Sequence, residues 1–366
     1  MSTAAAPDVY GSLRQHLTAG GKYRIPWRKE VMAILRIRFT PEEASLAVAM
    51  PVLGQSRVSL TELGRRAGRI PEEVSRLLAS MLAKGTVLAQ KDRKGVEVYC
   101  LWDFLYSLYS PLYGDGQDDD SKRQIAELRE RLWQDGYHFI WFSSRFPFNR
   151  VMPHEAAIDP SQAAEPWEKA SEYVRQAKEI AAVACGCRAS TKRCSKPLWT
   201  CIYFDAEADY WVRHKGGRKL TPDECLDNLR RGAEAGLVIT RANDRGMPRV
   251  ICQCCNDCCI ILRHYTENHS PYALDKSNFV PFFDSGKCRA CLTCAKACPV
   301  GAIGRVPAQE ENKKDRMIVM EQRCIGCGLC AIKCPNQAVK LRRARDIMPP
   351  PTIKEAFARY AAETLW

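Results

Sequence analysis

Long uncharged apolar runs are missing from this sequence of 366 residues. No window of about eighteen residues is both apolar and free of charge, which excludes a membrane-spanning helix of ordinary length. Residues 1–8 also lack a basic segment followed by an apolar one, so they predict no signal peptide. We therefore expect a cytoplasmic protein without a membrane span.

Motifs for nucleotide and radical chemistry are absent as well. The sequence has no G-x-G-x-x-G segment, no P-loop of the form G-x4-G-K-S/T and no C-x3-C-x2-C motif of radical-SAM enzymes. The six histidines form no H-x-x-x-H pattern and are expected to be surface or core residues: His16, His138, His154, His214, His264 and His269. We therefore predict no catalytic residues in this chain and assign substrate chemistry to another protein.

Cysteine is almost absent from the first half of the chain, since 18 of the 19 cysteines follow residue 184. A reducing cytoplasm does not preserve disulfides, so clustered thiols in this number indicate metal ligation. The chain also carries 55 basic and 42 acidic side chains, which gives a formal net charge of +13. This excess favours an acidic partner, nucleic acid or an anionic surface without choosing among them.

Residues 57–101 give the clearest secondary-structure pattern of the first half. A first helix begins after Ser59, which can form a capping box with Glu62. A second helix runs from Pro71 to Gly85. Its apolar residues share one face, which predicts burial: Val74, Leu77, Leu78, Met81 and Leu82.

Two strands follow and complete a pattern that resembles a winged helix-turn-helix domain. The strands are expected at residues 86–90 and 96–101, around a turn at 92–95. Such a domain binds DNA through its second helix or contacts another protein. Glu72 and Glu73 begin that helix and would repel phosphates, which favours a protein contact and leaves DNA as the alternative partner.

The second half contains an internal repeat of four cysteines followed by proline. The pattern C-x2-C-x2-C-x3-C-P occurs at residues 288–299 and again at 324–335, so the offset from 288 to 324 is 36 residues. Similar residues follow each copy, at 300–303 and 336–339, as expected of a duplicated supersecondary unit. The pattern indicates two 4Fe-4S clusters held by cysteine thiolates.

The fourth cysteine of each copy is predicted to ligate the other cluster, because three thiolates on one tight loop reach three iron corners. One ligand set is Cys288, Cys291, Cys294 and Cys334. The other ligand set is Cys324, Cys327, Cys330 and Cys298. Residues 282–341 thus resemble a bacterial two-cluster ferredoxin, which implies two short hairpins and two helices around the clusters. A zinc ribbon is disfavoured, because zinc sites lack the crossed fourth cysteine.

Basic residues surround these motifs, whereas soluble carrier ferredoxins are commonly acidic. Arg289, Lys296 and Lys333 lie inside the two copies, and Lys340 and Arg342 follow them. Positive charge next to a cluster favours its reduced form and suits an acidic redox partner, such as a flavin- or metal-containing oxidoreductase. A merely solvated basic face is the alternative.

Nine further cysteines lie upstream of the repeat. They are Cys185, Cys187, Cys194, Cys201, Cys252, Cys254, Cys255, Cys258 and Cys259. Soft thiolates in this number select iron–sulfur clusters or zinc, and a chain that already assembles clusters favours the former. We predict one or two additional 4Fe-4S clusters here, with structural zinc as the alternative. Cys100 and Cys225 stand alone and are expected to be buried small hydrophobic residues.

The order of these motifs over residues 57–341 resembles a group of bacterial and archaeal 4Fe-4S dicluster-domain proteins. The similarity includes a C-x-C-R segment at 185–188 and an Ala-Gly-Leu-Val segment at 235–238. Many members carry a denser cysteine run where Asn256 and Asp257 interrupt it here, so the ligands of the middle domain stay open. The resemblance implies electron transfer through several clusters, in many cases in anaerobes, and little about a substrate.

We predict an α+β protein with several domains. They are a winged helix-turn-helix domain at 1–113, a helical and aromatic linker at 114–165, a cysteine-rich α/β domain at 166–280, a ferredoxin-like domain with two 4Fe-4S clusters at 281–345 and a C-terminal tail at 346–366.

The predicted function is iron–sulfur electron transfer between 4Fe-4S clusters and a partner oxidoreductase in anaerobic metabolism. The protein is then an electron-transfer subunit rather than a stand-alone enzyme. The alternative is a redox-sensing transcription regulator, in which the clusters switch DNA binding by the winged helix. A third hypothesis gives the upstream cysteines a catalytic cluster with an open iron for a small substrate.

Overall fold

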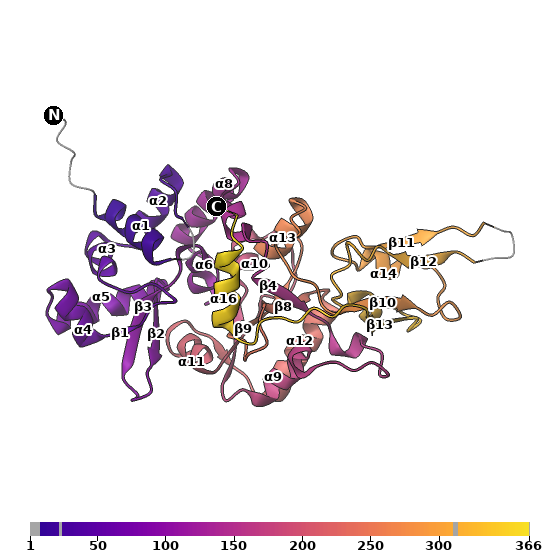
Figure 1. Ribbon diagram of the computed structural model, residues 1–366. Coiled ribbons are helices and arrows are strands. Elements are labelled where there is room, and N and C mark those ends of the chain that lie inside the picture. Colours follow the sequence, from indigo (N-terminus) through magenta and orange to yellow (C-terminus); the bar gives the residue numbers. More distant parts are fainter. Residues whose placement is uncertain (1–7, 22–23, 310–313, 366) are drawn as a thin grey trace. The chain divides into compact units, whose positions relative to one another are not determined.

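The computed structural model describes residues 8–21, 24–309 and 314–365 (Figure 1). The chain forms two compact units, each built from three segments. The first unit contains residues 1–141, 183–191 and 206–219. The second unit contains residues 142–182, 192–205 and 220–366. The prediction about a signal peptide falls on residues 1–7 and so lies outside the described part of the chain.

The first unit is mainly helical. Its helices are α1 (Val9–Gly20), α2 (Lys29–Arg38), α3 (Pro41–Val48), α4 (Leu60–Ala67), α5 (Pro71–Lys84), α6 (Phe104–Ser107), α7 (Ser110–Tyr113), α8 (Asp120–Gln134), α10 (Gly186–Thr191) and α11 (Asp205–His214). Its sheet has the order β1-β3-β2. The strands are β1 (Val58–Ser59), β2 (Val87–Lys91) and β3 (Glu97–Leu101), and a short β7 (Arg218–Lys219) follows α11.

The helices and strands predicted for residues 57–101 are present at the expected positions. The Ser59 side chain accepts a hydrogen bond from the Glu62 N–H at 3.3 Å, while the Glu62 carboxylate binds Arg65 and Arg66. Ser59 thus caps the helix as expected, but Glu62 forms ion pairs with the two arginines instead of completing the capping box. The predicted apolar face of α5 is buried, as expected: Val74, Leu77, Leu78, Met81 and Leu82.

The polar face of α5 packs against α3. The buried Glu43 carboxylate accepts hydrogen bonds from Ser80 at 2.7 Å and from Lys84 at 2.6 Å. Farther along the same face, Arg76 pairs with Glu42 at 2.9 Å. Two basic side chains of α5 are therefore neutralised by carboxylates within the first unit.

A mixed α/β core forms the middle of the second unit. Its sheet contains, in this order, β4 (Asn149–Met152), β8 (Val238–Ala242), β9 (Val250–Cys254), β6 (Trp199–Phe204) and β5 (Ile180–Ala184). The neighbours β4–β8, β8–β9 and β9–β6 are antiparallel. Helices α9 (Ala170–Gln176) and α12 (Pro222–Glu234) contribute Val174, Cys225 and Leu229 to one core with Ile202 and Ile251 of the sheet. The predicted burial of Cys225 is therefore confirmed, as is that of Cys100 in the first unit.

The cysteine repeat folds into a small module of duplicated elements (Figure 1). Its elements are β10 (Phe279–Phe283), α14 (Thr293–Lys296), β11 (Ile303–Val306), β12 (Arg316–Val319), α15 (Leu329–Ile332) and β13 (Val339–Arg343). The starts of α14 and α15, at 293 and 329, lie 36 residues apart, and so do those of β11 and β13, at 303 and 339. Strands β11 and β12 pair as an antiparallel hairpin. Strand β10 pairs instead with β13, so the second expected hairpin is a pair between the two ends of the module.

Two more helices complete the second unit. Helix α13 (Ile260–Glu267) follows β9, and α16 (Ile353–Ala362) lies in the predicted tail. The tail packs on the unit through Phe357, whose ring centroid lies 4.7 Å from that of Phe148. Among the described residues, no helix is both long and apolar enough to cross a membrane.

Candidate metal centres

The two cysteine loops of the repeat share their backbone conformation. Ala290 and Leu292 of the first copy have positive φ values of 49° and 65°, and the equivalent Gly326 and Gly328 have values of 71° and 87°. A Cβ atom on Gly328 would lie 2.7 Å from the Cβ of Ala157, so this position requires glycine. Left-handed residues in such loops form concave nests of N–H groups, which are typical of iron–sulfur sites.

Backbone N–H groups also reach the fourth cysteine of each copy in the same way. The N–H of Ala302 donates to Cys298 Sγ at 3.2 Å, and the N–H of Ala338 donates to Cys334 Sγ at 3.3 Å. Hydrogen bonds to sulfur favour the thiolate over the thiol and help to set the reduction potential of a bound cluster. Both fourth cysteines are therefore oriented by their own copy.

The first predicted ligand set extends from the interior to the surface. Cys294 is buried near Cys288 and Cys334, and burial raises the pKa of its thiol to about 11. Cys291 is exposed, and its Sγ lies 3.4 Å from the hydroxyl oxygen of Thr293. Hydrogen bonds from the hydroxyl and the N–H of Thr293 hold the pKa of Cys291 below its usual value. The structure thus brings three of these thiols together and places the fourth at the surface.

The second predicted ligand set is enclosed. All four of its cysteines line one small pocket: Cys298, Cys324, Cys327 and Cys330. Burial raises the pKa of Cys327 to about 12 and raises that of Cys330 well above its usual value. The thiols of Cys324, Cys327 and Cys330 each interact electrostatically with Cys298 of the other copy.

The donor chemistry of both sets fits 4Fe-4S clusters. Each set offers four cysteine sulfurs, which are the ligands that such clusters take. A buried thiol ionises unfavourably alone but becomes a thiolate ligand when iron supplies positive charge. The ligand roles of these eight residues stay predictions, and the arrangement of their side chains agrees with what those roles require.

Arg345 belongs to this site although no sequence motif points to it. Its guanidinium donates to the carbonyl oxygens of Cys324 at 2.9 Å and of Ser277 at 2.8 Å. Burial raises the pKa of the Cys324 thiol, and the charge and hydrogen bond of Arg345 oppose that rise. The residue 36 positions earlier is Gln309, so the first copy has no matching cation at this point of the sequence.

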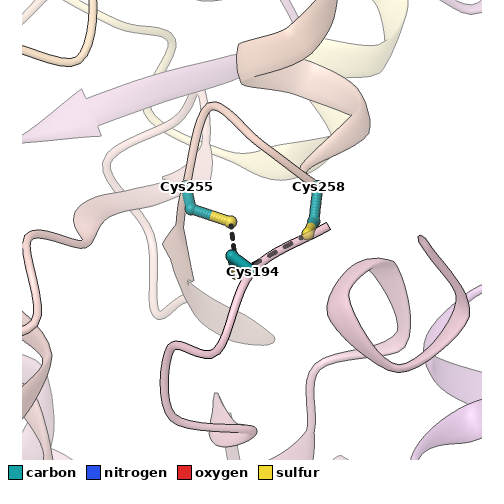
Figure 2. A group of neighbouring side chains, drawn as sticks. All are labelled: Cys194, Cys255 and Cys258. Carbon is teal, nitrogen blue, oxygen red and sulfur yellow. Dashed lines mark hydrogen bonds between the residues drawn. The ribbon is translucent and has the colours of Figure 1, made fainter. Parts of the chain in front are cut away.

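Three of the nine upstream cysteines converge in the second unit (Figure 2). The sulfur atoms of Cys194, Cys255 and Cys258 all lie within 4.8 Å of one another. Cys194 Sγ is 3.9 Å from Cys255 Sγ and 3.6 Å from Cys258 Sγ. The neighbouring Cys255 thiol raises the pKa of Cys258 well above its usual value.

A second group of upstream cysteines gathers around Cys252. Hydrogen bonds with Cys201 and Cys254 raise the pKa of the Cys252 thiol well above its usual value. The Sγ of Cys254 also lies 3.2 Å from the hydroxyl oxygen of Thr240. These three thiols lie on β6 and β9, next to each other in the sheet.

The remaining three upstream cysteines are Cys185, Cys187 and Cys259. Cys185 and Cys187 flank the first residue of α10 in the first unit. Cys259 precedes α13 and packs in the same core of the second unit as Cys252, Cys254 and Leu262.

The cysteine repeat matches a known family model. Residues 287–338, which include all eight cysteines of the two sets, match the 4Fe-4S dicluster domain. With the duplicated loops and the two thiol sets, this match defines an iron–sulfur protein of the dicluster class. Through this domain, the chain belongs to the 4Fe-4S dicluster domain family.

Several curated proteins are similar to part of this chain. The pyruvate synthase subunit PorD of Methanothermobacter marburgensis is 37% identical over 67 residues, which are 18% of this chain and 70% of that subunit. The electron transport protein HydN of Escherichia coli K12 is 32% identical over 101 residues, 25% of this chain and 53% of HydN. An uncharacterized ferredoxin of Methanocaldococcus jannaschii is 35% identical over 94 residues, 25% of this chain and 52% of the ferredoxin. The chain thus spans about half the length of the last two proteins.

Proposed function

We propose that the protein transfers single electrons through two 4Fe-4S clusters, to or from a partner oxidoreductase. The observation that carries this proposal is the pair of duplicated cysteine loops, which lie in the region that matches the 4Fe-4S dicluster domain. The proposed ligands of the first cluster are Cys288, Cys291, Cys294 and Cys334. Those of the second cluster are Cys324, Cys327, Cys330 and Cys298. When bound, such clusters supply one-electron oxidation and reduction.

The exposure of the two sets suggests where electrons enter or leave. Cys291 is exposed, whereas the loop cysteines of the second set are buried. Arg289 and Lys296 are exposed on either side of Cys291 in the sequence. Positive charges at this point suit an acidic partner, because complementary charge accelerates association. The first cluster is therefore the proposed contact with the partner.

The relatives support a subunit rather than a stand-alone enzyme. HydN is named an electron transport protein and PorD a subunit of pyruvate synthase. By analogy, we propose that this chain serves a flavin- or metal-containing oxidoreductase in anaerobic metabolism. A cytoplasmic location is part of the same proposal.

The helix-turn-helix segment is proposed to contact protein. Arg76 and Lys84 of α5 already pair with carboxylates of α3, which lowers the charge that α5 offers to DNA phosphates. The redox-sensing regulator stays the alternative. Salt-sensitive and sequence-specific retention of genomic DNA fragments in a gel-shift assay supports the regulator, whereas equal binding to every sequence supports the protein contact.

The additional clusters expected in the middle domain also stay a proposal. The group of Cys201, Cys252 and Cys254 on two paired strands is a candidate for one of them, with structural zinc as the alternative. Cys185 and Cys187 stay predicted metal ligands, as inferred from the sequence.

The first experiment is measurement of iron and acid-labile sulfide on anaerobically purified protein, with low-temperature EPR after reduction by dithionite. Two clusters correspond to about eight irons per chain, and further clusters add about four each. Cys294→Ala should lose one cluster, so its iron content should fall by about four.

Cys225→Ala is the matched control, because Cys225 is buried in the sheet core and belongs to neither ligand set. It should retain the iron content and the EPR signal of the unaltered protein. Full iron content in Cys294→Ala would contradict the ligand assignment, and clusters that dithionite cannot reduce would contradict electron transfer.

A further inference from the structure

The three converging thiols of the second unit come from two separate segments. Cys255 and Cys258 lie on the turn between β9 and α13, and Cys194 lies on the segment between α10 and β6 (Figure 2). Cys255 and Cys258 are buried, and Cys194 is half-buried. Folding of the second unit therefore holds three soft donors in one place, apart from both ligand sets of the dicluster domain.

The spacing of these sulfur atoms discriminates between kinds of metal centre. A tetrahedral ion with bonds of about 2.3 Å to sulfur holds two thiolates roughly 3.8 Å apart. The sulfur separations from Cys194, 3.9 Å to Cys255 and 3.6 Å to Cys258, agree with that value. In a cubane cluster each thiolate binds a different iron, so the sulfur atoms lie farther apart.

The dicluster cysteines provide an internal comparison. Each of the eight lies in the described part of the chain, and none belongs to a group of three ligand atoms within 4.8 Å of one another. The same chain thus shows a wide thiol arrangement around its cluster cavity and a narrow one at Cys194, Cys255 and Cys258. We infer that these three cysteines hold a single tetrahedral metal ion, Zn²⁺, rather than a cluster.

The described part of the second unit supplies three protein ligands for this ion. In the described part of the second unit, no fourth His, Cys, Asp or Glu brings a ligand atom within 4.8 Å of all three sulfurs. Asp257 lies between the two turn cysteines in the sequence, but its carboxylate pairs with Lys196 at 2.9 Å. A structural zinc is closed by four protein ligands, whereas an open zinc keeps one position for water or another small ligand. The proposal assigns the fourth position of this ion to a small non-protein ligand such as a thiol.

The surroundings agree with a soft divalent ion. Cys255 and Cys258 pack with the buried Leu237 and with Ala235, so the ion is shielded on that side by apolar atoms. Thiolates select Zn²⁺ over hard ions such as Mg²⁺ and Ca²⁺. The site shares no residue with either proposed cluster. The zinc proposal can therefore be tested independently of electron transfer.

The test is metal analysis of the anaerobically purified full-length protein together with three variants. Cys194→Ser and Cys258→Ser each remove one proposed ligand, and Cys225→Ala is the control. We expect about one zinc per chain in the unaltered protein and in the control, and at least a tenfold loss of zinc in both serine variants. The iron content and the EPR signal of the dicluster domain should not change.

Replacement of zinc by Co²⁺ gives a readout that needs no variant. A Co²⁺ ion held by three thiolates should show sulfur-to-metal charge-transfer bands and the intense visible bands of tetrahedral geometry. Addition of a small thiol should shift those bands, because it takes the fourth position. Bands that do not respond to the thiol would overturn the open position.

Two results would overturn the zinc site itself. One is a Cys258→Ser variant that folds and loses about four irons while its zinc content is unchanged, which would mean a cluster at this site. The other is protein as purified without zinc that also fails to give the tetrahedral spectrum with Co²⁺. Loss of zinc in Cys187→Ser as well would show a fourth thiolate and overturn the open position.

Discussion

Cys291 and Cys327 occupy equivalent positions of the repeat, yet Cys291 is exposed and Cys327 is buried. Cysteines at equivalent positions of the motif therefore have different electrostatic surroundings. The Thr293 hydrogen bonds lower the pKa of Cys291, whereas burial raises that of Cys327 to about 12. Exposure and hydrogen bonds to sulfur are among the factors that set cluster potentials, so the two clusters should differ in potential.

Arg345 gives a direct test of this difference. Arg345→Gln removes a positive charge that interacts with Cys324, so the reduced and more negative state of the second cluster loses stabilisation. We expect a lower reduction potential for that cluster and no shift for the other, measured by redox titration followed by EPR. Arg345→Lys is the control, because it keeps the charge and should preserve most of the potential. Equal shifts in both variants would mean that Arg345 acts only through its hydrogen bonds to the backbone.

At the scale of elements, the pairing of α3 with α5 is the most specific polar contact of the helix-turn-helix segment. The Glu43 carboxylate accepts a hydrogen bond from the backbone N–H of Thr40, the N-cap residue of α3. It also accepts hydrogen bonds from Ser80 and Lys84 of α5. Burial acts to raise the pKa of Glu43, but the hydrogen bonds from these partners lower it below its usual value. The carboxylate form is therefore the one that stabilises the two helices.

Glu43→Gln should lower the free energy of unfolding of the first unit by about 1–3 kcal/mol at neutral pH, since hydrogen bonds to a buried charge are lost. Because the pKa of Glu43 is lowered by folding, its contribution is present above the ordinary glutamate range and is lost as the pH falls through the lowered value. The difference in the free energy of unfolding between the variant and the unaltered protein should thus become smaller at acidic pH. Denaturant unfolding monitored by circular dichroism measures it.

Glu42→Gln is the matched control for this prediction. Glu42 is exposed and pairs with the exposed Arg76, and such surface pairs contribute about 0–1 kcal/mol. A loss in Glu42→Gln as large as that in Glu43→Gln would contradict the argument from burial.

Elements with local signals were predictable from the sequence, and contacts between distant segments were not. The caps and apolar periodicity of α4 and α5 lie within a few residues, so both helices begin and end where expected. The β10–β13 pair joins residues about sixty positions apart, and no local pattern specifies it.

The grouping of the upstream cysteines could not be predicted from the sequence for the same reason. Cys254 and Cys255 are adjacent in the sequence but belong to different thiol groups. Cys254 is the last residue of β9, and successive side chains of a strand point to opposite sides. Only the folded chain shows which side Cys194 approaches, whereas the crossed dicluster sets are a prediction from spacing alone.

At the scale of the whole molecule, the net charge of +13 is expected to act on the rate of electron transfer. Arg289→Glu with Lys296→Glu reverses the charge beside Cys291. In stopped-flow oxidation of the reduced protein, we expect this variant to react at least several-fold more slowly with anionic anthraquinone-2-sulfonate. It should react faster with cationic methyl viologen, and both effects should fade as ionic strength rises.

Arg93→Glu is the control for charge, because Arg93 is exposed in the first unit and not part of the repeat. It should change both rates much less than the reversal beside Cys291. Equal effects of the two charge changes would mean that the total charge of the protein, and not a docking point near the first cluster, governs the reaction.

The division of each unit into three chain segments has a consequence for synthesis on the ribosome. Trp102 of the first unit packs against Tyr210, with ring centroids 5.7 Å apart, so this unit is incomplete until α11 has been translated. The dicluster cysteines follow later still, at 288–334. A nascent chain can therefore finish its helical unit before any cysteine of the repeat has emerged, and iron–sulfur loading becomes a late step of maturation. A fragment that stops at residue 141 would lack Tyr210 and leave Trp102 without this packing.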